Sequence, residues 1–281
     1  MAEHRKTALG FPIGHVRTAD LLVLFLPGLS GNQRQWDAVV PLLAEEPAEI
    51  AFGAPILRNV DIGLDVPRIE NLAALMAVEI SALGYSTVVV VTHSVGAFVG
   101  CELAASIPTV VSRLVIVNGA LTTVAGLLDR PVKTLMRHPS RHWETIRLFV
   151  LVGAPIPRQV KRFIATNERL TRALVGGLVS HEAIDTHERR QSLIEDAGTP
   201  QTLQALSVNR HHWQVFQKNA RNVRCPVDLV VGELDPMGSA ADAKDFKELL
   251  PNATVHLLPS AGHAAPLEVP ADIAELIRAG I

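Results

Sequence analysis

The segment Thr87-Val-Val-Val-Val-Thr92-His-Ser94-Val-Gly96 carries the strongest structural signal in the sequence. Its apolar run is typical of a parallel strand buried on both faces, and the residues from Val95 to Ile107 have the pattern of a helix. A serine between a strand and a helix, with small flanking residues, is typical of a nucleophile elbow. Such a tight turn leaves no room for a side chain at Gly96 and holds the serine hydroxyl at the positive end of the helix. The alternative is an ordinary turn serine.

Further strands and helices alternate along the chain. Continuous apolar runs predict four more buried strands, at Leu21–Pro27, Arg113–Val117, Val227–Val231 and Thr254–Leu258, and a weaker one at Ile50–Ile56. Helical spacing of apolar residues occurs at Asn71–Leu83, Ala240–Leu250 and Ile273–Ile277. This alternation predicts an α/β protein with a mostly parallel sheet covered by helices on both faces.

The segment 121–216 breaks the alternation. It contains no strong strand pattern and looks like several helices separated by Pro and Gly. We therefore expect a core domain formed by residues 1–120 and 217–281, with residues 121–216 inserted as a helical lid. Between Ala120 and Phe216 there are 13 Lys or Arg and 8 Asp or Glu, so the lid is basic.

The composition favours a globular protein that acts on small molecules. A length of 281 residues suits one α/β domain with an insertion, and a net charge of −2 gives no reason to expect binding to nucleic acid or a membrane. The two cysteines, Cys101 and Cys225, lack the spacing of a disulfide framework or zinc site and are interpreted as buried thiols. We expect no metal or other cofactor. The apolar run Leu21–Leu26 is too short to span a bilayer, so a cytoplasmic location is predicted.

A serine hydroxyl needs a base to remove its proton. His263 follows the last predicted strand, at the edge of the sheet where sites form in open α/β proteins. The other histidines lie in the lid, near the N-terminus, within a strand or beside the serine. The base in turn needs an acid to set its tautomer, and Asp235 follows the strand Val227–Val231. Glu233 competes with Asp235, and an acid after an earlier strand, near Asn118 or Asp129, is a further alternative.

The loop Pro27-Gly-Leu-Ser-Gly31 follows the first strong strand. Its glycines allow backbone N–H groups to face a substrate oxygen. The natural oxyanion hole pairs the N–H of Leu29 with the N–H of Val95, the residue after the serine. A plain glycine turn before a helix is the alternative.

These motifs together resemble the α/β-hydrolase family. The resemblance rests on the chain order Ser94, Asp235, His263, on Gly232 to Asp235 ahead of the last strand, and on Gly262-His263 to Glu268 after it. It implies an eight-stranded sheet, with two short strands within Lys6–Arg17, and a helical cap at the position of the lid. The chain departs from many members at Pro27-Gly28, where they have His-Gly, and at Thr92, where they have Gly.

Within that family the serine separates branches. Haloalkane dehalogenases and epoxide hydrolases use aspartate at this position, and carbon–carbon bond hydrolases usually have tryptophan where Ala264 follows His263. The resemblance is therefore to bacterial carboxylesterases and lactonases, and it implies cleavage of a small-molecule ester, lactone or thioester through an acyl-enzyme on Ser94. Other serine-type chemistry, as in a carbon–carbon hydrolase, an acyltransferase or a cofactor-free oxygenase, is the first alternative. A small-molecule receptor with little turnover is the second, and the oligomeric state is left open.

Aromatic residues of the lid are candidates for a substrate pocket. Trp143 and Trp213 are the two chosen as pocket residues. Ordinary packing of lid helices explains each of them equally well.

Overall fold

The structure of the chain is a computed structural model. It describes residues 7–28, 33–53, 68–120, 122, 156–175, 185–187, 190–191, 194 and 211–281. These ranges include the elements on either side of Ser94 and the whole C-terminal part from residue 211. Most of the segment 121–216 lies outside the described residues.

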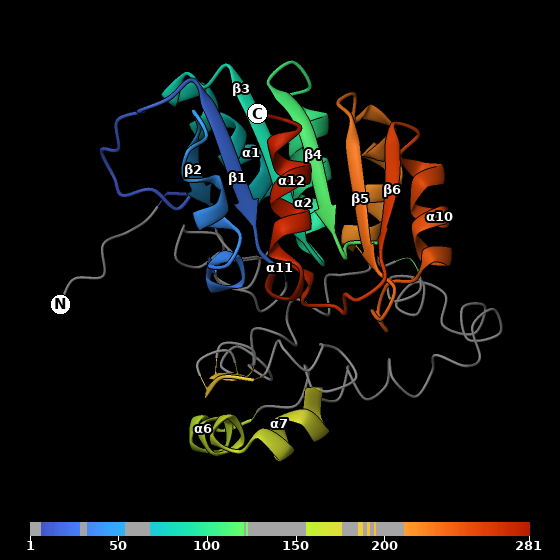
Figure 1. Cartoon of the computed structure of the whole chain (residues 1–281). Coiled ribbons are helices and arrows are strands. Elements are labelled where there is room, and N and C mark those ends of the chain that lie inside the picture. The colour runs from blue at the N-terminus through green and yellow to red at the C-terminus, as the bar shows by residue number, and fades with distance from the viewer. Residues whose placement is uncertain are drawn as a thin grey trace.

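A parallel sheet forms the centre of the molecule (Figure 1). Its strands are β1 (Leu21–Leu26), β2 (Glu49–Phe52), β3 (Thr87–His93), β4 (Val111–Val117), β5 (Val227–Gly232) and β6 (Ala253–Leu258). They lie in the order β2-β1-β3-β4-β5-β6, and every neighbouring pair is parallel. All six predicted strands are confirmed, and so is the α/β-hydrolase fold class. The two extra strands expected within Lys6–Arg17 are not found among the described residues there, 7–17, which contain turns and one isolated bridge residue, Pro12.

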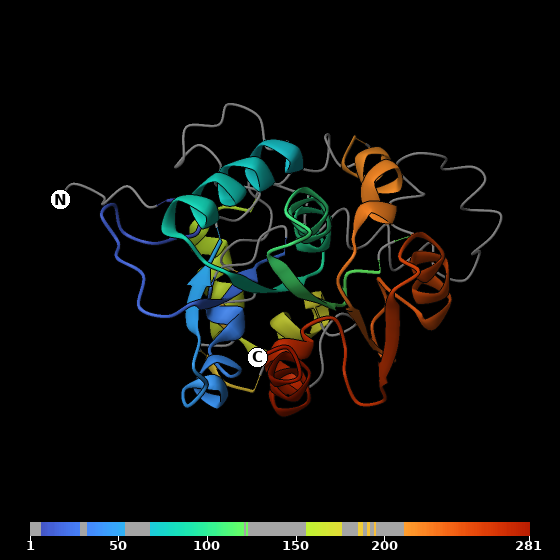
Figure 2. The ribbon, with the colours of Figure 1, turned by 90° about the horizontal axis from the view of Figure 1, so that it is seen from above.

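Helices cover both faces of the sheet (Figure 2). One face carries α1 (Ile69–Leu83), α2 (Gly96–Ser106), the short η6 (Ala220–Asn222) and α10 (Ala240–Leu249). The other carries η1 (Gln33–Trp36), η2 (Val40–Leu43), α11 (Ala265–Glu268) and α12 (Pro270–Arg278). The helices predicted from apolar spacing are all present, with ends shifted by at most three residues.

The side chains of β1 point alternately to the two faces of the sheet, so this strand contributes to both hydrophobic cores. Successive side chains of a strand point to opposite faces of the sheet. Leu22 and Leu24 join the core under α1 and α2, whereas Val23 and Phe25 join the core under α12. All four side chains are fully buried, and each contributes about 1.5–3 kcal/mol by the usual transfer estimate. The uninterrupted apolar run in the sequence thus reflects burial from both sides.

The strand order reverses at β1, because β2 lies on one side of it and β3 on the other. In open parallel sheets, the loops that leave the carboxyl ends of strands diverge at such a point and leave room for a site. The loops after β1 and β3 are those of Gly28 and Ser94. The topology therefore predicts a site at the carboxyl edge of the sheet, between these two loops.

Two helices of the predicted lid are described, α6 (Arg158–Thr166) and α7 (Glu168–Val175). Both lie beyond the carboxyl edge of the sheet, on the side to which the strands point (Figure 1). A further helical stretch over residues 211–219 leads into η6, and Asn219 donates both of its bonds to the carboxylate of Glu102 in α2. The domain boundary predicted after residue 216 therefore falls inside a helix that packs on the core.

Cys101 and Cys225 are both buried and not in a disulfide. Burial raises the pKa of both thiols. Within the described part of the chain, no helix has the length and apolar character needed to cross a membrane.

Asp228 is a charged residue that is buried within strand β5. Asp228 of β5 is 4% exposed, and its two carboxylate oxygens contact Arg113 Nε at 2.6 Å and His256 Nε2 at 2.8 Å. Arg113 comes from β4 and His256 from β6, so the carboxylate joins three neighbouring strands. A buried carboxylate is tolerated only when such donors satisfy it.

We expect Asp228→Asn to lower the free energy of unfolding by about 2 kcal/mol, because an amide turns one acceptor into a donor facing a donor. Glu46→Gln is the matched control. Glu46 accepts from Arg278 at 3.0 Å, but the Arg278 side chain is 44% exposed, so the expected change is below about 1 kcal/mol. Urea unfolding of both variants measures the difference. Equal changes would contradict the special role of the buried carboxylate.

Candidate active site

Ser94 occupies the turn between β3 and α2. Its backbone has φ of 52°, in the left-handed region that non-glycine residues rarely adopt. The turn is held by backbone bonds on both sides: the Ser94 N–H donates to Val117 O at 3.0 Å, and the Ala97 N–H donates to Ser94 O at 3.0 Å. The serine is 5% exposed and sits at the carboxyl edge of the sheet. The strand–turn–helix context predicted for it is therefore present.

Small residues are required around the turn. A Cβ on Gly96 would lie 2.6 Å from Pro27 O and 2.9 Å from Leu26 O, which is closer than real Cβ contacts come. A Cβ on Gly28 would lie 3.2 Å from Ser94 Cβ. The end of β1 and the start of α2 can approach each other this closely only with glycine at position 96, and a side chain at position 28 would crowd Ser94. Thr92, where many family members have glycine, is fully buried and reaches Val115 O at 3.4 Å.

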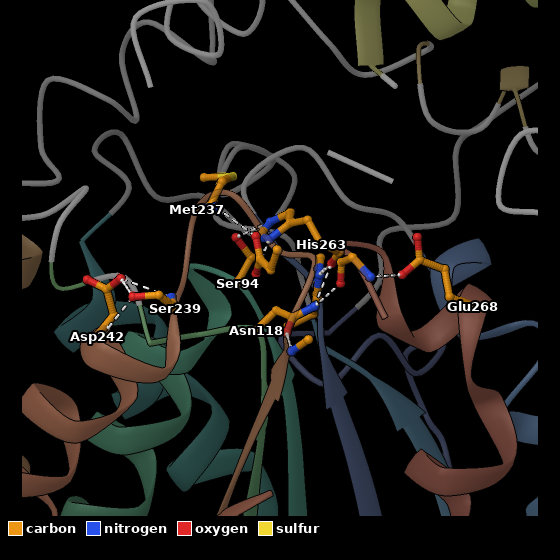
Figure 3. Close-up of polar contacts among 11 residues, drawn as sticks. Ser94, Asn118, Met237, Ser239, Asp242, His263 and Glu268 are labelled. Atoms are coloured by element: carbon orange, nitrogen blue, oxygen red, sulfur yellow. Dashed lines mark hydrogen bonds and ion pairs between the residues drawn. The ribbon is translucent and has the colours of Figure 1, made fainter. Parts of the chain in front are cut away.

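The three predicted catalytic side chains meet at this edge, and Figure 3 shows His263 beside Ser94. His263 Nε2 lies 3.2 Å from Ser94 Oγ, and His263 Nδ1 lies 3.0 Å from Asp235 Oδ2. A carboxylate can only accept, so Nδ1 carries the proton and Nε2 presents a lone pair to the hydroxyl of Ser94. The second oxygen of Asp235 accepts from the N–H of Met237 at 2.8 Å. This arrangement can deprotonate the serine.

Asp235 and its competitor differ in burial. The side chain of Asp235 is fully buried, whereas Glu233 is exposed. The backbone hydrogen bonds of this loop explain the difference. The N–H of Glu233 donates to Leu258 O and the N–H of Leu234 donates to Ala261 O, so the chain runs beside the His263 loop before it reaches Asp235. Asp235 is the residue that contacts the imidazole.

Electrostatics favour a charged imidazole at His263. Burial by itself lowers the pKa of His263, but the carboxylate of Asp235 outweighs it through its charge and hydrogen bond, with a smaller contribution from Glu268. The pKa of His263 is therefore raised above its ordinary value of 6.5. The site is built to accept a proton on the imidazole.

A second histidine lies against the first. The rings of His93 and His263 are 5.0 Å apart between centroids, and His93 Nε2 is 2.8 Å from the main-chain carbonyl oxygen of His263. A carbonyl only accepts, so His93 Nε2 carries the proton. Burial, together with repulsion from His263, lowers the pKa of His93 to about 3. His93 is thus a neutral donor that holds the backbone of the base.

Two further residues hold the loop of His263, and sequence reasoning missed both roles. Asn118, at the end of β4, donates from Nδ2 to Gly262 O at 2.7 Å and to His263 O at 3.0 Å. Glu268 accepts from the N–H of Gly262 at 2.5 Å (Figure 3). The position of Asn118 directly after a buried strand, at the same edge as Ser94, was the signal that could have identified it.

Only half of the predicted oxyanion hole can be located. Leu29 lies outside the described residues. Val95 stands at the N-terminus of α2, and within the described residues its N–H makes no hydrogen bond. A free backbone donor next to the nucleophile is what an oxyanion site requires.

The two predicted pocket residues have different outcomes. Trp143 lies outside the described residues. Trp213 is 7% exposed and packs against Phe98 of α2, with ring centroids 6.3 Å apart, and against Phe216 at 5.5 Å. These contacts belong to the core under α2, so core packing accounts for Trp213.

Comparison with known proteins identifies the family. A family model described as "Alpha/beta hydrolase family" matches residues 23–276. The "Putative carbamate hydrolase RutD" of Shigella flexneri is 24% identical over 262 residues, which cover 92% of this chain and 91% of that protein.

Solved structures share the fold. A thermophilic esterase from Thermogutta terrifontis aligns with a TM-score of 0.60 at 15% identity, covering 99% of this chain and 97% of the other. Est816, described as an N-acyl homoserine lactone degrading enzyme, aligns with a TM-score of 0.61 at 14% identity, covering 95% of each chain. The chain belongs to the alpha/beta hydrolase family.

Proposed function

We propose that the protein is a serine hydrolase that cleaves a carboxylic ester, lactone or thioester of a small molecule through an acyl-enzyme on Ser94. One observation carries the proposal: the continuous contact from Ser94 Oγ to His263 Nε2 and from His263 Nδ1 to the buried carboxylate of Asp235. Membership in a hydrolase family supports it, as does the likeness to an esterase and to a lactone-degrading enzyme.

The first half of the reaction forms the acyl-enzyme. His263 Nε2 takes the proton of Ser94, and Oγ attacks the carbonyl carbon of the substrate. The carbonyl oxygen becomes an oxyanion, which the N–H of Val95 faces at the positive end of α2. When the tetrahedral intermediate collapses, the imidazolium returns its proton to the departing alcohol or thiol.

The second half releases the acid. A water molecule replaces the leaving group and gives its proton to His263 Nε2, and the resulting hydroxide attacks the acyl carbon. Collapse of this intermediate breaks the bond to Ser94 Oγ, which recovers its proton from the imidazolium. Throughout, Asp235 holds the imidazole in the Nδ1–H tautomer and stabilises its positive charge.

The segment 121–216 is the proposed determinant of substrate choice. The described catalytic side chains, Ser94, Asp235 and His263, all come from loops that follow strands of the core. The helices α6 and α7 lie beyond the edge that carries these loops. A lid in this place excludes water and orients the acyl group. Its excess of basic residues favours substrates with an anionic or electron-rich part.

Ser94→Ala tests the proposed function directly. We expect turnover of a panel of short esters, lactones, thioesters and carbamates to fall by several orders of magnitude, because the variant has no nucleophile. Labelling by a fluorophosphonate should disappear with it. Measured kcat/KM on the panel identifies the substrate class, and mass spectrometry of the labelled wild-type protein identifies the modified residue.

The variant must be folded for the result to count, so its thermal unfolding is compared with that of the wild-type protein. Ser106→Ala is a matched control, since Ser106 ends α2 and its hydroxyl donates to Glu102 O within that helix, its one side-chain bond among the described residues. Near wild-type turnover by folded Ser94→Ala would refute the acyl-enzyme. A wild-type protein that labels at Ser94 but hydrolyses nothing in the panel would favour the receptor alternative.

The pH profile separates the two candidate acids. The raised pKa of His263 predicts that kcat/KM is full at high pH and falls as the pH drops through a value above 6.5, because the protonated imidazole is no longer a base. Asp235→Asn removes the charge that raises this pKa and cannot fix the tautomer. We expect it to lower kcat about 10⁴-fold and to move the acid limb to lower pH.

Glu233→Gln is the matched control, because it removes the same negative charge from an exposed side chain that lies two residues before Asp235. It should leave kcat and the acid limb within about twofold of the wild-type protein. The opposite ranking of the two variants would move the acid to Glu233.

A further inference from the structure

Asn118 occupies an unusual place in the fold. It follows β4 directly, is 1% exposed, and has φ of 48°, so it lies in the left-handed region like Ser94. Asparagine tolerates this conformation better than most residues. Its own N–H donates to Val230 O at 2.8 Å, which fixes the Asn118 backbone against β5. The side chain is therefore presented from a rigid support.

All three of its described side-chain bonds go to the backbone of the two loops that carry the acid and the base. Oδ1 accepts from the N–H of Gly232 at 2.9 Å, at the start of the Asp235 loop. Nδ2 donates to Gly262 O at 2.7 Å and to His263 O at 3.0 Å. One amide group therefore joins the ends of β5 and β6 from the end of β4.

The two loops meet directly through the N–H of Leu234, which donates to Ala261 O at 3.0 Å, and the amide of Asn118 adds the contacts to the residues that follow, Gly262 and His263. A Cβ on Gly232 would lie 2.3 Å from Ala261 O and 2.8 Å from Gly262 O, so backbone meets backbone here without side chains. The main-chain carbonyl oxygen of His263 accepts two hydrogen bonds, from Asn118 Nδ2 and from His93 Nε2, and these bonds fix the peptide next to the imidazole. A small rotation of that peptide would move both ring nitrogens relative to Asp235 and Ser94.

We propose that Asn118 is a positioning residue that couples the Asp235 loop to the His263 loop and thereby sets the contact between His263 Nδ1 and Asp235. The amide suits this task because it offers an acceptor and two donors in one plane. A carboxylate of the same shape has no donor for the two carbonyl oxygens. The inference rests on the proposed function, since positioning matters to catalysis only if His263 acts as a base.

Two variants test the role. Asn118→Gly removes the side chain but keeps the left-handed backbone without strain. Asn118→Asp keeps the shape and replaces the donors by a charge that repels the carbonyl oxygens. We expect each to lower the rate of Ser94 labelling by a fluorophosphonate about 10- to 100-fold, the scale of a displacement of about 1 Å in a catalytic group. KM for the best substrate of the panel should change less than kcat.

A spectroscopic measurement follows the contact itself. The proton on His263 Nδ1 should give a low-field NMR signal in the wild-type protein, identified by its loss in His263→Gln. In both Asn118 variants we expect faster exchange of this proton with water and a weaker signal. Because the added carboxylate favours the imidazolium, Asn118→Asp should also move the acid limb of the labelling rate to higher pH.

A double-mutant cycle separates positioning from general stability. If Asn118 acts through the acid–base contact, Asn118→Gly combined with Asp235→Asn should label no more than about threefold more slowly than Asp235→Asn alone. Asn252→Gly is the matched control, because Asn252 also donates to two carbonyl oxygens, those of Val223 and Arg224, away from Ser94. It should leave labelling unchanged.

The outcomes are distinct. Folded Asn118 variants that label within twofold of the wild-type rate and keep the low-field signal would overturn the proposal, and so would losses that multiply independently with Asp235→Asn. If wild-type Ser94 does not label at all, the proposed function fails. The low-field signal then still decides whether Asn118 holds the contact.

Discussion

The carbonyl oxygens of Leu26 and Pro27, at the end of β1, lie so close to Gly96 that any side chain at this position would collide with them. This approach brings the amino end of α2 to the loop after β1, at the point where the strand order reverses. The turn that makes it possible holds Ser94 in a left-handed conformation, which costs on the order of 1–3 kcal/mol and must be repaid by the surrounding structure. The fully buried valines of β3 and the bond from Ser94 N–H to Val117 O supply that support.

Parallel strands explain how residues far apart in sequence reach one place. Every carboxyl end of the sheet lies at the same edge, so Ser94, Asp235 and His263 need only follow β3, β5 and β6. The intervening strand, β4, contributes Asn118 rather than a reacting group. Loops cannot fix each other by side chains where glycine is required for clearance, and backbone hydrogen bonds then take over that task.

The sequence predicts those features that leave a local pattern. Strands buried on both faces show as apolar runs, and the serine turn shows as small residues around Ser94, so the fold and the three side chains that meet at the site could be derived. The place of Asn118 at this edge follows from its position after a buried strand, but its role does not, because its partners are backbone groups 114 and 144 residues away, which have no signature of their own. The pocket role of Trp213 stays a prediction for a related reason: an aromatic residue at helical spacing packs equally well in a lid or against α2.

The two histidines at the site have pKa values shifted in opposite directions, because their surroundings differ. Both are covered, but only His263 has a carboxylate beside its ring, so its pKa is raised while that of His93 falls to about 3. His93 therefore stays neutral when His263 gains a proton, and it avoids a second positive charge 5.0 Å away. Its Nε2–H bond to the His263 carbonyl persists through such a change. A neutral donor can hold the backbone of His263 in both protonation states of its imidazole without placing a second positive charge beside it.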